Sequence, residues 1–244
     1  MKKYLTLILS MLTLNMSYAQ SVEKNTDTKY IDFIKSFKEE TKSNIIDFRR
    51  IINIEAPMSK EEAQRFVYHT DDTTKLYCVE FNYSNENEEF RGITGTFLWL
   101  PNKCLKINMG DYFFVAYNSY QCVNSCPDPN KLRECFKNKE FNVFLTLCVV
   151  DKTFNLRDSM LVCNDDGYDS FVKGCLNPKN GKFFLFYTHG DLEKPEMNKA
   201  YMYEVNKENL KFEIIKEENV SKDMPTDDLI GVIEKLGWKK AFFE

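Results

Sequence analysis

The residues of this chain that could do chemistry are its cysteines and histidines, of which it has eight and two. The densest group is Cys122, Cys126 and Cys135, in a polar, proline-containing insertion near 120–136 between two expected strands. Such a group could bind zinc, act as a redox pair, or pin a surface loop by a disulfide. Its spacing is looser than that of a typical redox pair and no helical pattern follows it, so we favour the disulfide-pinned loop.

All eight cysteines lie after residue 19, and their even number favours disulfides in an oxidising compartment. The sequence does not reveal which cysteine pairs with which. Cys148, Cys163 and Cys175 each fall within an expected strand, where they are either bridged or simply buried as small apolar residues. The candidate disulfide cysteines are Cys78, Cys104, Cys122, Cys126, Cys135, Cys148, Cys163 and Cys175.

Only His69 and His189 are present to activate a catalytic thiol or to ligate a metal. Each lies near a carboxylate at the expected end of an element, and the pair could form a site if the fold brings them together. We favour the alternative that they are turn histidines with local hydrogen bonds. The acidic stretch 164–169 could hold Ca²⁺, but it lacks the alternating ligands of a calcium loop, so we expect a hairpin turn. Known catalytic and nucleotide-binding signatures are absent, so no catalytic residue, metal or cofactor is predicted.

The first residues have the layout of a secretory signal peptide. Lys2 and Lys3 precede an apolar run over 4–14, and small residues precede an expected cleavage site between Ala19 and Gln20. The run is too short for a membrane-spanning helix, and no later stretch is apolar enough to span a membrane. We therefore expect residues 1–19 to be removed and 20–244 to work in the periplasm, at the cell surface or in the medium. An uncleaved anchor is the alternative.

Composition limits the partners and the fold class. The net charge is −4, the basic residues are scattered and no nucleic-acid motif occurs, so a nucleic-acid role is not expected. The chain has 20 Phe and 13 Tyr but only 9 Gly, which suits antiparallel sheet with a helical layer. The length after residue 19 suits one globular domain with a substantial core.

Helices are expected at both ends of this domain. Apolar residues at helical spacing predict a helix over 29–42, with Thr28 as its cap. Residues 44–58 are expected to be extended or irregular. Ser59 and Glu62 form a capping box for a short helix ending near 68. The last helix should follow 225–228, with Gly237 after its end and a tail over 238–244 that docks as a strand or stays loose.

The middle of the chain predicts strands. Asn180-Gly181 is its strongest hairpin signal, because both residues tolerate positive φ. Short turns between strands favour sequential antiparallel neighbours. We therefore expect an α+β fold in which one antiparallel meander of about eight to ten strands packs its apolar face on the helices. The expected strands are 76–83, 93–100, 104–108, 112–119, 141–150, 159–163, 171–176, 183–188, 200–205 and 210–216.

Three features together resemble the small exported proteins of unknown function from Bacteroidota. They are a signal peptide ending in Ala19-Gln20, the helix start at 59–63, and a hairpin over 143–162 followed by an Asp/Gly turn. The resemblance spans about 33–186 and implies no activity or site residue. Asp72-Thr73-Thr74 and Asp158-Ser159-Met160 also resemble the O-glycosylation acceptor sequence of that group, and Thr73 is the better candidate because it lies in an expected loop.

These observations leave three hypotheses for function. The first is an exported, non-enzymatic protein that binds an unidentified envelope or extracellular ligand or partner, for which exposed aromatic residues on a sheet face would be evidence. The second is an exported hydrolase whose site is assembled from distant loops. The third is a structural or stress-related module without a small ligand. The oligomeric state does not follow from the sequence.

Overall fold

The computed structural model of the chain describes residues 27–40, 44–52, 56–67, 101–122, 141–165, 172–188, 198–221, 224 and 227–244. The expected signal peptide, the expected strands over 76–83 and 93–100 and most of the cysteine-rich insertion lie outside the described residues.

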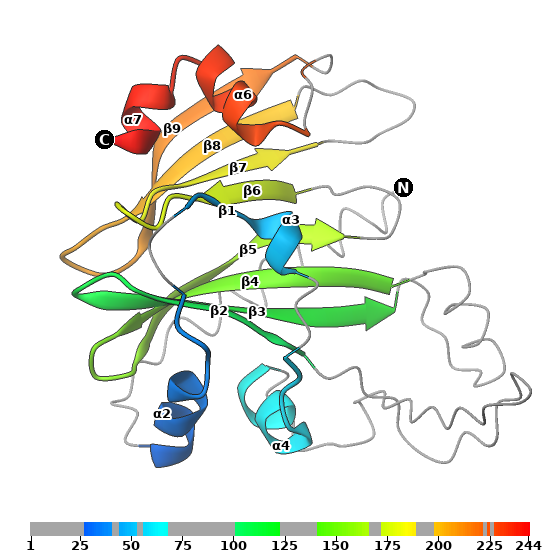
Figure 1. Cartoon of the computed structure of the whole chain (residues 1–244), viewed down its shortest axis with the longest axis vertical. Helices are drawn as coiled ribbons and strands as arrows, with labels where there is room; N and C mark the ends of the chain where they lie inside the picture. The colour runs from blue at the N-terminus through cyan, green and yellow to red at the C-terminus, as the bar shows by residue number, and fades with distance from the viewer. Residues whose placement is uncertain are drawn as a thin grey trace, which may run out of the picture.

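Among the described residues, the strands form two antiparallel sheets (Figure 1). In the first sheet the order is β2 (Lys103–Asn108), β3 (Tyr112–Cys122), β4 (Phe141–Asp151) and β5 (Leu156–Asp165). The second sheet has the order β1 (Ile46–Asp47), β6 (Val172–Leu176), β7 (Phe183–Tyr187), β8 (Asn198–Val205) and β9 (Phe212–Val220). The α+β class and the antiparallel pairing are confirmed, whereas the single meander is wrong, because the sheet is split between β5 and β6.

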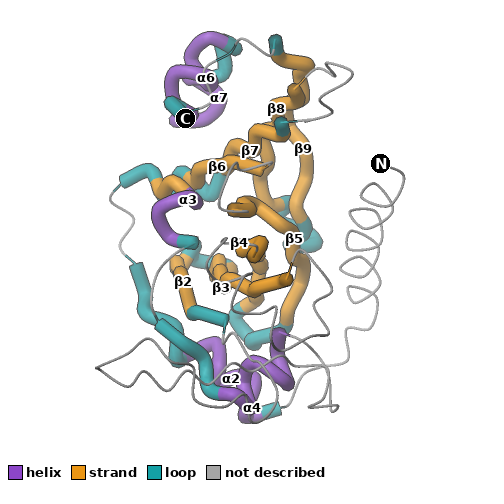
Figure 2. Tube along the Cα trace, turned by 90° about the vertical axis from the view of Figure 1, so that its right-hand side faces the viewer, coloured by secondary structure: helices purple, strands orange, loops and turns teal. Residues whose placement is uncertain are grey.

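The split follows from strands that are apolar on both faces. In β7, Phe183 and Leu185 face one core while Phe184 and Phe186 face another, and all of these are buried. A sheet with two apolar faces must be covered twice. Stacking the two sheets buries one face of each, and helices cover the remaining faces (Figure 2).

Three clusters of buried residues mark these layers. The core between the sheets contains Phe48, Phe114, Leu145 and Phe183, among others. The outer face of the second sheet is covered by α6 (Leu229–Lys235) and α7 (Lys239–Phe243), and the outer face of the first sheet by α2 (Thr28–Lys35), α4 (Lys60–Glu62) and the π-helical turn η1 (Ala63–Val67). The inner face of each sheet is the face toward the other sheet.

The helices differ from expectation mainly in length. The first one is α2, which begins after Asp27 rather than Thr28 and ends at Lys35. The capping box is confirmed: the Glu62 amide donates to Ser59 Oγ at 3.1 Å, and the Ser59 amide donates to Glu62 Oε2 at 2.8 Å. The stretch expected to be extended or irregular contains β1 and a short helix, α3 (Phe48–Ile51).

The C-terminal tail forms helix α7, so the expectation of a strand or a loose end is wrong. Trp238 and Phe242 are buried against the outer face of the second sheet. The carbonyl of Phe242 accepts hydrogen bonds from the side chains of Asn177 and Asn180, and that of Ala241 accepts one from Lys182. Donors from the β6–β7 loop thus satisfy carbonyls that a helix end leaves unpaired.

In the β6–β7 loop, only one of the two residues expected to tolerate positive φ adopts it. The loop spans four residues between Asn177 and Lys182, and Gly181 has a φ of 77° while Asn180 has no positive φ. The hairpin itself is confirmed, since Leu176 pairs with Phe183. Glycine is needed at position 181 both for its backbone conformation and because a Cβ there would lie 2.7 Å from the hydroxyl of Tyr112.

Candidate functional site

Most residues singled out from the sequence lie outside the described part of the chain. These include both histidines, so their distance from each other is not tested. Cys122 ends β3, but its side chain is not described. The candidate residues outside the described part include Ala19, Gln20, His69, Thr73, Cys78, Cys126, Cys135 and His189, together with 166–169 of the acidic stretch.

The remaining cysteines are buried in the cores. Cys104, Cys148 and Cys175 are free thiols, and Cys163 is buried with its sulfur 3.9 Å from the carbonyl oxygen of Asn164. Burial raises the pKa of Cys104 and of Cys148 to about 12, and it also raises the pKa of Cys175. These three groups are therefore protonated thiols at neutral pH, and they pack as small apolar side chains.

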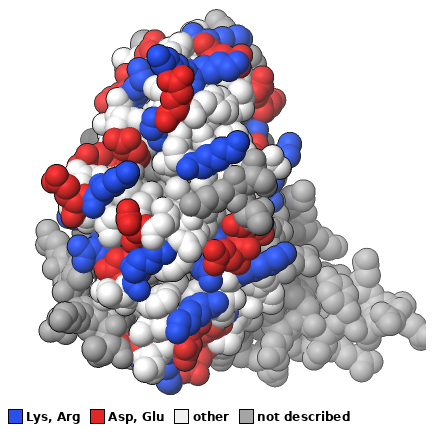
Figure 3. Space-filling model, turned by 60° about the vertical axis from the view of Figure 1, so that its left-hand side comes forward, with Lys and Arg blue, Asp and Glu red and all other residues white. Residues whose placement is uncertain are grey.

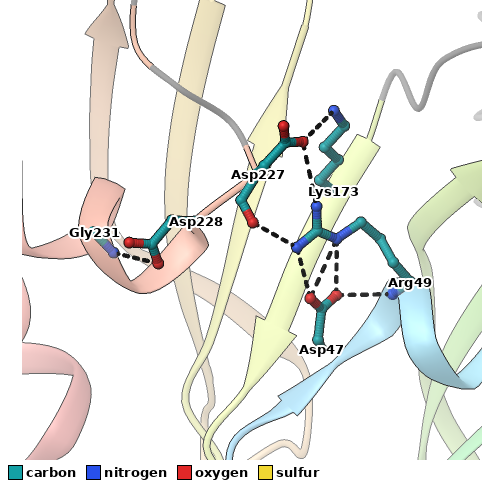
Figure 4. Close-up of polar contacts among 6 residues, drawn as sticks. All are labelled: Asp47, Arg49, Lys173, Asp227, Asp228 and Gly231. Carbon is teal, nitrogen blue, oxygen red and sulfur yellow. Dashed lines mark hydrogen bonds and ion pairs between the residues drawn. The ribbon is translucent and has the colours of Figure 1, made fainter.

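A cluster of charged residues lies on the outer face of the second sheet, beside the start of α6 (Figure 4). Asp47 pairs across the ladder with Cys175, and Lys173 pairs with Phe186, so all of these side chains leave the sheet on the same face. Arg49 reaches this face from α3. The cluster therefore gathers charges from β1, α3, β6 and the segment before α6.

Asp47 holds the guanidinium of Arg49 in a fixed orientation. Its carboxylate accepts from Nε at 3.0 and 3.2 Å and from Nη2 at 2.6 Å, and it also accepts from the Arg49 amide at the start of α3. These hydrogen bonds raise the pKa of Arg49 above its ordinary value. Arg49 is thus a permanent, immobilised cation.

Arg49 also connects α3 to the entrance of α6. Its Nη2 donates to the carbonyl oxygen of Asp227 at 3.0 Å, and the next residue, Asp228, caps α6 by accepting from the Gly231 amide at 3.0 Å. The guanidinium therefore joins two segments that are far apart in the chain, which gives it a structural role in addition to its charge.

Lys173 supplies the second cation of the cluster. It lies within a strand that is buried throughout, and it is only 8% exposed. Its Nζ is 4.0 Å from Asp227 Oδ1, and Arg49 Nη1 is 3.8 Å from the same oxygen. Both distances exceed those of direct hydrogen bonds, which are about 3 Å. The Asp227 carboxylate, whose side chain is 96% exposed, therefore makes only loose contact with the two cations.

Such an arrangement can bind an anion. A planar guanidinium and an ammonium group that converge on one point provide both the charge and the hydrogen-bond donors that a carboxylate or a phosphate needs. The sequence analysis missed this cluster, because its members are separated by long stretches of chain. One local signal was available: Lys173 is the single charge in the otherwise apolar strand Val172–Leu176.

The aromatic side chains provide no comparable surface. The rings that are fully buried are those of Phe48, Phe114, Phe183, Phe184, Phe186 and Phe242, whereas the large apolar side chains exposed in the described part are Leu156, Ile214 and Phe243. On the face drawn in Figure 3, acidic and basic residues are interspersed rather than separated by sign. A local cluster, rather than a broad field or an aromatic platform, is therefore the feature that stands out.

Comparison of the chain with protein-family models, with curated proteins and with solved structures finds no match. No group of three or more His, Cys, Asp or Glu side chains suited to a metal ion occurs within the described residues. The helices found there include none that is long and apolar enough to cross a membrane.

Proposed function

We propose that the protein is an exported, non-enzymatic binding protein that takes an anionic group of its ligand between Arg49 and Lys173. Export is supported by the signal-peptide layout of residues 1–19. The binding site is supported by one observation above all. Two cations from different elements point toward the same exposed carboxylate, that of Asp227, without touching it.

In this proposal Asp227 occupies the place of the ligand. Its carboxylate competes for the cations when no ligand is present, and a ligand carboxylate or phosphate displaces it by approaching within hydrogen-bond distance. Asp47 keeps Arg49 oriented in both states, because it uses Nε and Nη2 and leaves Nη1 directed at the ligand. The low exposure of Lys173 strengthens its attraction for an anion, since nearby water is scarce.

Calorimetric titration with inorganic phosphate and with succinate tests the proposal through two substitutions of opposite effect. Asp227→Asn removes the competing carboxylate and should tighten binding by about 2–5-fold, the range expected for an exposed ion pair. Lys173→Met keeps the apolar stem packed on the sheet but removes the charge, and it should weaken binding by about tenfold or more.

Lys179→Gln, at the exposed position of the β6–β7 loop, is the matched control and should bind like the native protein. A second candidate role follows from the bond between Arg49 and the Asp227 carbonyl, which could make the cluster a purely structural clamp. If neither anion binds, or if both Asp227→Asn and Lys173→Met leave binding unchanged, the binding proposal is wrong and the clamp remains.

A further inference from the structure

Strand β9 is the last strand of the second sheet, and among the described residues only β8 pairs with it (Figure 2). At the beginning of its other edge, the Phe212 amide donates to Asp158 Oδ2 at 2.9 Å. Beyond it, the backbone of 213–220 makes no hydrogen bond to another described residue outside the ladder with β8. Ile214 on this edge is 52% exposed, which is unusual for a branched apolar residue on a strand. Open edges of this kind can pair with another strand.

A bulge in β9 determines which side chains share a face. Met202 pairs with Lys216 and Tyr203 pairs with Ile214, so Ile215 is the extra residue. Phe212, which packs on the inner core, therefore shares its face with Ile214 and Glu217. Glu213, Lys216 and Glu218 lie on the outer face, where Lys216 Nζ is 5.8 Å from the centroid of the Trp238 ring.

The backbone groups that face the open edge follow from the same register. The Phe212 amide points away from β8, as its bond to Asp158 shows. Alternation along the strand, corrected for the bulge, makes Ile214 and Glu217 the next residues whose amide and carbonyl groups point outward. A partner strand would therefore form its hydrogen bonds at these positions.

We propose that two copies of this chain pair through their β9 edges, antiparallel, with Ile214 on the twofold axis. In this register Ile214 lies opposite Ile214 of the second copy, and Phe212 lies opposite Glu217, whose carbonyl oxygen replaces Asp158 Oδ2 as the acceptor of the Phe212 amide. On the outer face, Glu213 lies opposite Lys216, and Lys211 lies opposite Glu218. Each ion pair occurs twice because the interface is isologous, so the charge pattern of the edge is complementary to itself.

A change of register changes which charges face each other. Moving the axis to Glu217 would place two identical carboxylates directly opposite each other, which is repulsive. The alternative view of the same charges is that they protect the edge from any pairing, as charged residues often do. The order of the signs favours pairing, since the Ile214 register places opposite charges in both outer-face pairs, whereas the Glu217 register does not. This inference is independent of the proposed anion site.

Analytical ultracentrifugation of the purified protein over a range of concentrations tests the pairing. The native protein should show a reversible monomer–dimer equilibrium. Lys216→Glu places like charges opposite each other twice and should weaken dimerisation by about tenfold or more. Combining it with Glu213→Lys exchanges the two signs and should restore the native equilibrium. Lys207→Glu, in the exposed β8–β9 turn, is the matched control and should change nothing.

A crosslinking experiment tests the register. Residues that face each other in a hydrogen-bonded antiparallel pair have their Cα atoms about 5.5 Å apart, within the range of a disulfide. Ile214→Cys should therefore give a covalent dimer on a non-reducing gel, and Glu217→Cys should not. A protein that stays monomeric at all concentrations, a double swap that fails to restore the dimer, or crosslinking through position 217 instead of 214 would overturn the proposal.

Discussion

Replacement of Asn118 is the most direct test of how the first sheet holds the segment before α4. Asn118 in β3 is completely buried. Its Nδ2 donates to the carbonyl oxygen of Ile52 at 2.7 Å, and its Oδ1 accepts from the Asn102 amide at 2.6 Å. Asn102 continues the network by accepting from the Ala56 amide at 3.0 Å. One side chain thus connects β3 to the end of α3 and to the start of β2.

Asn118→Ala leaves a buried carbonyl and a buried amide without these partners. Each such group costs about 1–3 kcal/mol, so the free energy of unfolding should fall by about 2–6 kcal/mol, a large share of the ~5–15 kcal/mol typical of a domain. Urea denaturation followed by tryptophan fluorescence measures this change as a lower midpoint at unchanged slope. Asn209→Ala, which removes one exposed hydrogen bond in a turn, should cost less than about 1 kcal/mol.

Asn118→Asp separates the loss of a donor from the loss of volume. The introduced carboxyl group keeps an acceptor for the Asn102 amide, but it brings oxygen toward the Ile52 carbonyl, so it must be protonated to donate there. Its pKa in the folded protein is therefore raised, and the stability of this variant should be greatest at low pH and fall as the pH rises. If Asn118→Ala is as stable as Asn209→Ala, the network does not hold the segment as argued.

Two further predictions concern a turn and the buried thiols. Gly181→Ala should destabilise the protein by about 1–2 kcal/mol, because the new Cβ meets the Tyr112 hydroxyl and the backbone φ is positive. Thermal unfolding measures this loss, and an unchanged melting temperature would contradict the argument. The ordinary pKa of a cysteine thiol is 9.0, and burial raises the pKa of Cys104 and of Cys148 to about 12. Between these two values both thiols ionise in the unfolded chain but stay protonated in the folded protein. The stability that comes from keeping these two thiols protonated is therefore complete below pH 9 and should be lost progressively between pH 9 and 12. Iodoacetamide should label both cysteines only after the protein unfolds. Labelling of either cysteine in the native protein at pH 8 would refute their burial.

Local patterns were sufficient to predict strands β2 to β9. Each strand expected within the described residues is present, although several bounds move by a few residues, because alternation and turn residues act over short distances. The capping box at Ser59 and Glu62 is confirmed for the same reason. The tail after Trp238 was misjudged, because its helical form depends on burial of Trp238 and Phe242 against β-strands distant in the chain.

The amino-acid sequence by itself therefore determined strands β2 to β9, their antiparallel pairing and helices α2, α4 and α6, since these depend on neighbours a few positions apart. Only the tertiary structure decided that the sheet divides into two, because both faces of β7 needed cover. It also decided that Arg49 and Lys173 meet at Asp227. Contacts of that kind depend on how whole layers stack, and no local spacing of residues encodes them.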